Sequence, residues 1–151
     1  MDAGKYGHWK TCWEFDPNDF VGFVYRIVDI DTHQEYIGKK FFSKSIKKRI
    51  KGKKNRKIIQ KESDWKTYTG SCHELNDEIE QRGENRFQFC ILSLHESRAS
   101  LAYREVELQV KENVVREKLP NGIKKYYNQF IAPIKFKIPD ETDTEKRFKV
   151  D

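Results

Sequence analysis

The chain has no long apolar run. Only 36% of its 151 residues are hydrophobic, and no stretch approaches the ~20 apolar residues that cross a bilayer. The N-terminus lacks the apolar region of a secretory signal, so we expect no membrane partner and a cytoplasmic protein. Cysteines are few, odd in number and widely spaced, at Cys12, Cys72 and Cys90. They fit reduced structural thiols and disfavour a disulfide framework or a zinc site.

Positive charge is abundant and unevenly distributed. The length suits one domain with a single core, and the net charge is +6 with 36% charged residues. From Lys39 to Lys66 there are thirteen Lys or Arg against Glu62 and Asp64. A local block of this kind predicts binding to a phosphate backbone. A solvated loop is the alternative interpretation of such a run.

Two short runs near the N-terminus predict a β-hairpin. Val21–Asp29 and Glu35–Phe41 alternate in polarity and are rich in β-branched or aromatic residues. The polar residues between them are those expected of a turn. Strands of a hairpin lie side by side, so Tyr25 and Tyr36 can present two phenols to one point.

The rest of the chain predicts a mixture of helices and strands. The further elements are a helix in the basic segment, bounded or interrupted at Gly52, a helix over Ser71–Gln81, a strand over Arg86–Leu94, a helix from Ser97 or Ser100 to about Lys118, and a short apolar piece over Tyr126–Ile131. Ser71 and Glu74 give the Ser71–Gln81 helix a capping-box pattern, and Gly83 can end it. This order indicates an α+β domain with a small sheet flanked by helices.

A set of residues in a fixed order carries a family resemblance. With Tyr25, then Tyr36-Ile37-Gly38, Glu105 and Asn128, the chain resembles the GIY-YIG nuclease superfamily. The first signature is degraded to Phe23-Val24-Tyr25, whereas the second is intact. The chain looks closest to the single-domain, phage-encoded members related to Seg-type homing endonucleases. The resemblance implies the α+β GIY-YIG nuclease fold, with a three-stranded antiparallel sheet flanked by helices.

The resemblance covers roughly Val21 to Ile134. We therefore expect an N-terminal arm over residues 1–20, a nuclease domain over 21–135 and a charged C-terminal tail over 136–151 that is disordered. The arm is aromatic, and we expect it to pack on the domain or to touch a partner.

The resemblance also implies roles for the residues that carry it. The implied reaction is hydrolysis of a phosphodiester with a single divalent ion, Mg²⁺ or Mn²⁺. Glu105 would be the only protein ligand of the metal, and Tyr25 would activate or position the attacking water. Tyr36 would hold the water or the scissile phosphate, and Asn128 would tie the site together through hydrogen bonds.

An arginine on the first helix normally completes such a site by contacting the phosphate. Arg49 and Arg56 are the candidates, and Arg56 is favoured because Ile58 and Ile59 beside it suggest a helix packed on the core. The lysines expected to contact DNA are Lys39, Lys40, Lys47, Lys48, Lys51, Lys53, Lys54 and Lys57.

These features predict a divalent-metal-dependent DNA endonuclease. We expect a phage or mobile-element enzyme of the nicking or homing type, acting in the host cytoplasm as a monomer or a transient dimer. Two alternatives remain open at this point. One is a catalytically silent nucleic-acid-binding module on the same fold, and the other is an RNA-directed nuclease, because phosphate contacts do not report the sugar.

Overall fold

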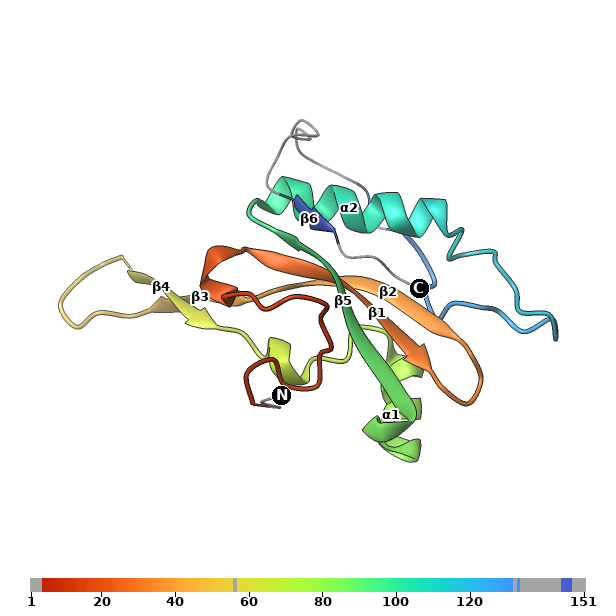
Figure 1. Cartoon of the computed structure of the whole chain (residues 1–151). Helices are drawn as coiled ribbons and strands as arrows, with labels where there is room; N and C mark the ends of the chain where they lie inside the picture. The colour runs from red at the N-terminus through yellow and green to blue at the C-terminus, as the bar shows by residue number, and fades with distance from the viewer. Residues whose placement is uncertain (1–3, 56, 132, 134–144, 148–151) are drawn as a thin grey trace.

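A computed structural model of the chain describes residues 4–55, 57–131, 133 and 145–147. Its main sheet is antiparallel, with strand order β2-β1-β5-β6 (Figure 1). The strands of this sheet are β1 (Gly22–Asp29), β2 (Glu35–Phe41), β5 (Phe87–His95) and the short β6 (Glu145–Arg147). Two helices accompany it, α1 (His73–Arg82) and α2 (Arg98–Lys111). The predicted α+β class and the three-stranded antiparallel sheet of β2, β1 and β5 are confirmed.

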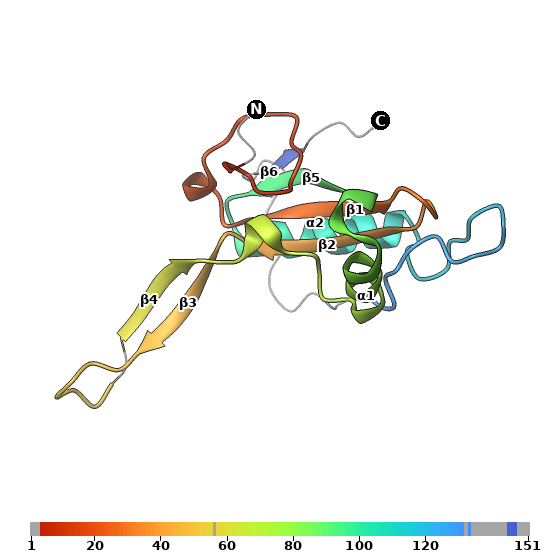
Figure 2. The ribbon, with the colours of Figure 1, turned by 90° about the horizontal axis from the view of Figure 1, so that it is seen from below.

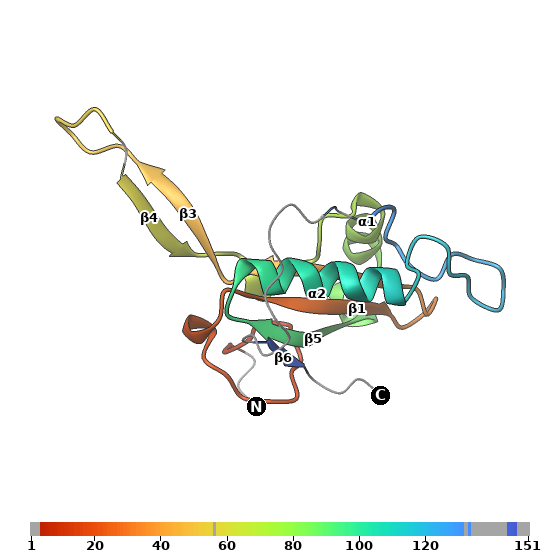
Figure 3. The same ribbon diagram turned by 90° about the horizontal axis from the view of Figure 1, so that it is seen from above.

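Alternation along β1 gives the sheet two apolar faces. Val24 and Ile37 lie on the face that α2 covers (Figure 3), where they join Leu101 and Leu108 of that helix. The opposite face carries an aromatic cluster that includes Tyr25 of β1 and Trp9 of the N-terminal segment. A strand with both faces covered must be apolar on both sides, which explains the near-continuous burial of β1.

The N-terminal segment packs against β5. The Lys10 amide donates to the Phe89 carbonyl at 2.7 Å, and the Ile91 amide donates to the Lys10 carbonyl at 2.9 Å. Trp9 is only 2% exposed, and its ring centroid lies 4.9 Å from that of Tyr25. The segment therefore covers the face of the sheet on which Tyr25 lies.

The helix predicted in the basic segment is wrong. That segment forms an antiparallel ribbon of β3 (Ser43–Lys48) and β4 (Lys57–Glu62). The ribbon extends away from the body of the molecule in both views (Figures 1 and 2). Cross-strand pairing of Ile46 with Ile59 favours strands, and Gly52 adopts a φ of 83° in the connecting loop.

The predicted helices are present with shifted ends. The helix α1 is preceded by Cys72, with no side-chain hydrogen bond at its cap, so the predicted capping box at Ser71 is wrong. The predicted end of this helix at Gly83 is confirmed, since Gly83 has a φ of 94° and its amide donates to the Ile79 carbonyl. The α2 helix is capped by Ser97 and ends at Lys111, well before Lys118. Asn113 has a φ of 52° just beyond that end, a left-handed conformation that terminates helices.

Most of the predicted C-terminal tail lies outside the described residues. Within it, Glu145–Arg147 forms β6, which pairs antiparallel with β5 and so is ordered where disorder was expected. In the described part of the chain, no helix combines the length and apolar character needed to cross a bilayer.

Candidate active site

The two motif tyrosines lie on the same face of the first hairpin. Tyr25 is opposite Gly38 in the strand register, and Tyr36 is opposite Ile27, which places the rings diagonally with centroids 6.2 Å apart. A Cβ added at Gly38 would lie 2.5 Å from Tyr25 Oη and 3.0 Å from Tyr36 Cε1. The glycine of the Tyr36-Ile37-Gly38 motif therefore provides the space that the Tyr25 ring occupies.

Asn128 closes the outer edge of β2. Its Oδ1 accepts from the Ile37 amide at 3.0 Å, and its Nδ2 donates to the Ile37 carbonyl at 2.8 Å. Gln109 of α2 donates its Nε2 to the same carbonyl at 2.9 Å. Asn128 and Gln109 thus hold the middle residue of the second motif from two different segments.

Glu105 reaches the same place from α2. It is 8% exposed, and its Oε1 lies 2.9 Å from Lys39 Nζ. An open cleft of about 710 Å³ runs around the edge of β2 and is lined by Tyr25, Tyr36, Glu105 and Asn128. The structure therefore brings together the four positions identified from the sequence.

The cleft carries more positive than negative charge. Its charged lining residues are Lys39, Lys40, Lys44 and Arg98 against Asp64 and Glu105. Lys40 Nζ lies 2.7 Å from Asp64 Oδ1 and 3.9 Å from the centre of the Tyr68 ring. The hydrogen bond from Lys40 lowers the pKa of the Asp64 carboxyl. A cleft with this balance favours an anionic ligand.

Both phenols remain neutral near neutral pH in the protein alone. Burial raises the pKa of Tyr25 well above its usual range, and the neighbouring Tyr36 and Glu105 add to the effect. Burial also raises the pKa of Tyr36, against a hydrogen bond from Ser71. As neutral phenols these groups donate hydrogen bonds, whereas a phenolate would need an added cation nearby.

Neither arginine predicted to contact the phosphate is observed in the cleft. Arg49 is exposed in the β3–β4 loop and does not line the cleft, and Arg56 lies outside the described residues. Arg98, the first residue of α2, lines the cleft with its guanidinium 5.2 Å from the centre of the Phe41 ring. Sequence reasoning missed it, although its spacing of seven from Glu105 places the two on one face of a helix.

The predicted DNA-binding lysines form two groups. Lys39 and Lys40 line the cleft. The other six, Lys47, Lys48, Lys51, Lys53, Lys54 and Lys57, lie on the β3–β4 ribbon or in its loop. Contact of either group with DNA stays a prediction.

The donor set fits a hydrated magnesium ion. Among the described residues no cluster of three or more His, Cys, Asp or Glu could hold a metal. The cleft offers two separate carboxylates, Asp64 and Glu105, and Glu105 is the one whose charge acts on both Tyr25 and Tyr36. Mg²⁺ keeps several waters and is held by one or two carboxylates together with substrate phosphates. Gln109 Oε1, one helical turn from Glu105, is buried without a hydrogen-bond partner in the described structure. It is a second oxygen able to accept from a metal-bound water.

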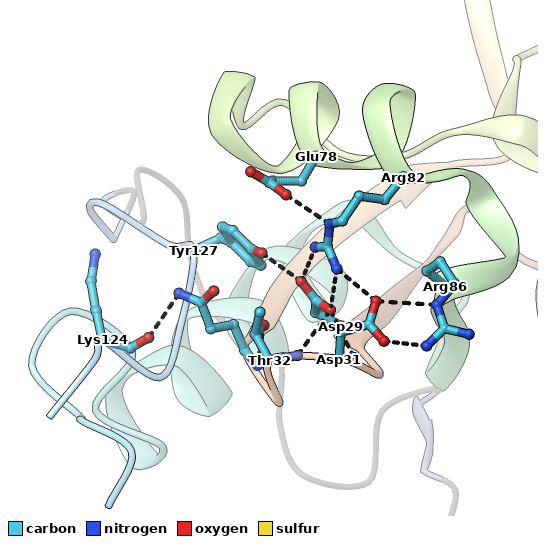
Figure 4. Close-up of polar contacts among 9 residues, drawn as sticks. Asp29, Asp31, Thr32, Glu78, Arg82, Arg86, Lys124 and Tyr127 are labelled. Atoms are coloured by element: carbon cyan, nitrogen blue, oxygen red, sulfur yellow. Dashed lines mark hydrogen bonds and ion pairs between the residues drawn. The ribbon is translucent and has the colours of Figure 1, made fainter. Parts of the chain in front are cut away.

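An ion-pair network fixes the segment that carries Asn128. Figure 4 shows Asp29 at the end of β1, where its carboxylate pairs with Arg82 of α1 and accepts a hydrogen bond from the Tyr127 hydroxyl at 2.8 Å. Burial alone would raise the pKa of Asp29, but the hydrogen bonds from Arg82 and Tyr127 outweigh it and lower the pKa to about 2. Asp31 adds ion pairs with Arg82 and Arg86. The network ties the hairpin turn, α1 and the residue before Asn128 into one unit.

A hairpin with two tyrosines on one face, a helix glutamate and an edge-binding asparagine form an arrangement that fits a nuclease site of the GIY-YIG type. The chain belongs to this family, because the family described as "Putative endonuclease segE, GIY-YIG domain" matches residues 7–131. No curated protein and no solved structure matched the chain at a significant level. The protein is thus a GIY-YIG endonuclease, a phosphodiester hydrolase acting on nucleic acid, of a family that generally uses a divalent metal.

Proposed function

We propose that this protein is a divalent-metal-dependent DNA endonuclease that nicks one strand per encounter. The observation that carries the proposal is the convergence of Tyr25, Tyr36, Glu105 and Asn128 on one positively charged cleft. A single cleft has the parts for one phosphodiester at a time. Double-strand cleavage then requires a second visit or a transient dimer.

The chain's residues divide the work in the cleft. Glu105 would hold the Mg²⁺ or Mn²⁺ ion, which supplies charge neutralisation at the phosphate and at the leaving oxygen when bound. The neutral phenols of Tyr25 and Tyr36 donate hydrogen bonds that orient the attacking water and the scissile phosphate. Asn128 keeps the edge of β2, and with it Tyr36, in place.

Cations at the mouth of the cleft bind the phosphate backbone. Lys39 and Lys40 follow the second motif directly, and Arg98 faces the cleft from the start of α2. We assign the phosphate-contacting arginine to Arg98. Arg49 lies in the ribbon loop and does not line the cleft, and Arg56, the candidate favoured from the sequence, lies outside the described residues. A guanidinium suits this role because it binds a phosphate in a bidentate manner.

The proposal extends to origin and compartment. A nuclease domain of the segE type fits a phage or mobile element and a homing-type role in the host cytoplasm. The odd, widely spaced cysteines suit that reducing compartment.

Conversion of supercoiled plasmid tests the activity. With Mg²⁺ the wild-type protein should produce open circles, and with EDTA it should not. Glu105→Ala should reduce the rate by about a thousandfold or more, as expected when charge stabilisation in the transition state is lost. Glu107→Ala removes a carboxylate that pairs with Arg104 on the same helix and should cut like the wild type.

The other results discriminate between functions. Equal cutting by the wild type and Glu105→Ala would contradict the assignment of the site. Intact, salt-sensitive binding without cleavage of any plasmid would indicate a silent binding module. Cleavage of a labelled RNA but not of DNA would indicate an RNA-directed nuclease, and direct linearisation would indicate paired active sites.

A further inference from the structure

The β3–β4 ribbon is an exposed, two-stranded structure that projects from the nuclease body (Figures 1 and 2). Every residue of β3 and β4 is exposed, so packing on the main sheet contributes little to its stability. An isolated two-stranded ribbon is at best marginally stable in water. The family match includes the whole ribbon, which makes it part of the nuclease domain.

The strand register concentrates positive charge on one face of the ribbon. Lys44 pairs with Lys61 and Lys48 pairs with Lys57, with Ile46 opposite Ile59 between the two lysine pairs. We call these six residues the lysine face. Like charges directly opposite each other destabilise a strand pair. In the described part of residues 39–66 the internal ion pairs are Lys40 with Asp64 and Lys66 with Glu62. Lys44 also acts on the Asp64 charge, whereas no described carboxylate offsets the Lys48–Lys57 pair.

The other face of the ribbon has a different chemistry. It carries the register pairs Ser43 with Glu62, Ser45 with Gln60, and Lys47 with Ile58. Gln60 Nε2 donates to Ser45 Oγ at 2.7 Å, so polar groups on this face bond to each other across the strands. The two faces are therefore not equivalent, because the lysine face carries four lysines and no carboxylate, whereas the other face carries one lysine and one glutamate.

We propose that the lysine face docks in the major groove of duplex DNA beside the scissile phosphate. The proposal rests on DNA being the substrate of the cleft. Strands in a ribbon lie ~4.8 Å apart, and the major groove is ~12 Å wide, whereas the minor groove is only ~6 Å wide. The lysine pairs reach phosphates on the two walls of the groove, and Ile46 with Ile59 contacts base edges on its floor.

The ribbon is placed to act together with the cleft. Lys44 belongs to the lysine face and also lines the cleft, and only Phe42 separates β3 from β2. The six residues of β3 span roughly 20 Å, which matches the length of helix axis occupied by about six phosphates of one strand, at ~3.4 Å each. The ribbon therefore contacts duplex on one side of the cut.

Binding to a labelled random-sequence duplex tests the proposal without knowledge of the target. Fluorescence anisotropy would be measured in EDTA on Glu105→Ala protein, with and without the further changes Lys48→Ala and Lys57→Ala. Removal of two phosphate contacts should lower the slope of log affinity against log salt by about 1.8. Methyl green, which occupies the major groove, should displace the protein with the intact ribbon more than the ribbon variant. Netropsin, which occupies the minor groove, should displace neither.

Two matched variants keep charge and position separate. Lys111→Ala with Lys118→Ala removes the same charge from exposed positions at and beyond the end of α2 and should leave the slope unchanged. Ser45→Ala with Gln60→Ala alters the opposite face of the ribbon and should leave methyl green competition unchanged. The proposal would be overturned if the Lys111/Lys118 variant lost as much salt slope as the ribbon variant, or if the Ser45/Gln60 variant lost as much methyl green competition. Competition by netropsin would also overturn it. Circular dichroism would establish that each variant is folded.

Stability gives a second readout that does not depend on DNA. Removal of Lys48 and Lys57 ends a like-charge contact, so amide exchange in the ribbon should become slower while duplex binding weakens. Faster exchange would contradict the repulsion on which the proposal depends. Plasmid nicking with an unchanged salt slope would refute the ribbon contact and leave the nuclease standing. Groove-selective binding without nicking would support the ribbon contact and refute the proposed nuclease activity.

Discussion

Lys39 Nζ lies 2.9 Å from Glu105 Oε1, so the carboxylate assigned to the metal is paired with a cation of the chain itself. Lys39 follows the second tyrosine motif directly and projects toward α2, which carries Glu105. An ion bound through Glu105 Oε1 would compete with this ammonium. Lys39 would then be free to contact a phosphate beside the ion.

Lys39→Met should therefore strengthen metal binding in the absence of DNA. The pair is partly exposed and is worth roughly 1 kcal/mol, which corresponds to about a fivefold change in affinity. Isothermal titration with Mn²⁺ measures it directly. Lys40→Met, which loses a contact with Asp64 instead, is the matched control and should bind the ion as the wild type does. An unchanged affinity in Lys39→Met would contradict the competition.

Arg98→Gln and Arg49→Gln should affect cleavage in different ways. Arg98 lines the cleft, so its loss should lower the single-turnover rate by about a hundredfold to a thousandfold. Arg49 lies in the ribbon loop, so its loss should leave that rate unchanged at saturating protein and reduce the salt slope of binding by about 0.9. A rate defect in Arg49→Gln at saturation would reverse the assignment.

Gly38→Ala should disable the site through steric conflict. The added Cβ would lie 2.5 Å from Oη and 2.7 Å from Cζ of Tyr25, which is 1% exposed and packs against the rings of Trp9 and Tyr36. We expect destabilisation of about 1–3 kcal/mol and a loss of cleavage larger than the loss of folded protein explains. Thermal unfolding and nicking report the two effects. Gly122→Asn lies where a Cβ meets nothing within 4 Å but φ is +85°, so it should lower stability through backbone strain and leave cleavage per folded molecule unchanged.

Asn128→Leu should cost more stability than Gln109→Leu. The Ile37 carbonyl accepts from both amides, so loss of Gln109 leaves it satisfied by Asn128. The Ile37 amide donates to Asn128, and loss of that acceptor leaves a buried donor unpaired, at about 1–3 kcal/mol. Urea denaturation of the two variants gives the order. The reverse order would mean that the α2 contact, and not the edge contact, holds β2.

Asp29→Asn should alter the pH dependence of stability. Hydrogen bonds from Arg82 and Tyr127 overcome the effect of burial and lower the pKa of Asp29 to about 2. Because the carboxyl pKa is lower in the folded protein than in the unfolded chain, where it is near 3.9, ionised Asp29 stabilises the folded state above that pH. This contribution fades as the pH falls toward 2. The difference in unfolding free energy between wild type and Asp29→Asn should be about 2 kcal/mol at pH 6 and should shrink below pH 4. Asp31→Asn, in the same network but partly exposed, should show a smaller effect.

Some of the fold could be predicted because its periodicity is local. The alternation of Phe23, Tyr25 and Ile27 identifies β1, and β2 has the bounds Glu35–Phe41 that the sequence predicts. The ribbon was missed because lysines are compatible with helices, and only the cross-strand pairing of Ile46 with Ile59 identifies strands.

The site was predictable only in part. The tyrosines, Glu105 and Asn128 could be found because the family resemblance fixes their order. Arg98 and Gln109 have no such signature, since their place in the cleft follows from the face of α2 on which they lie. The role of Asp29 was also hidden, because a turn aspartate in the sequence gives no sign that Arg82 and Tyr127 converge on it.

Asn128 has a consequence for solubility as well as for catalysis. The strand β2 lies at the edge of the main sheet, and an open edge is a template on which another chain can add a strand. The amide of Asn128 covers the backbone of Ile37, and the Tyr127 amide covers that of Glu35 at 2.7 Å. Asn128 and Tyr127 therefore occupy hydrogen-bonding groups on the edge of β2 with which another chain could pair. Loss of these contacts would open that edge to self-association.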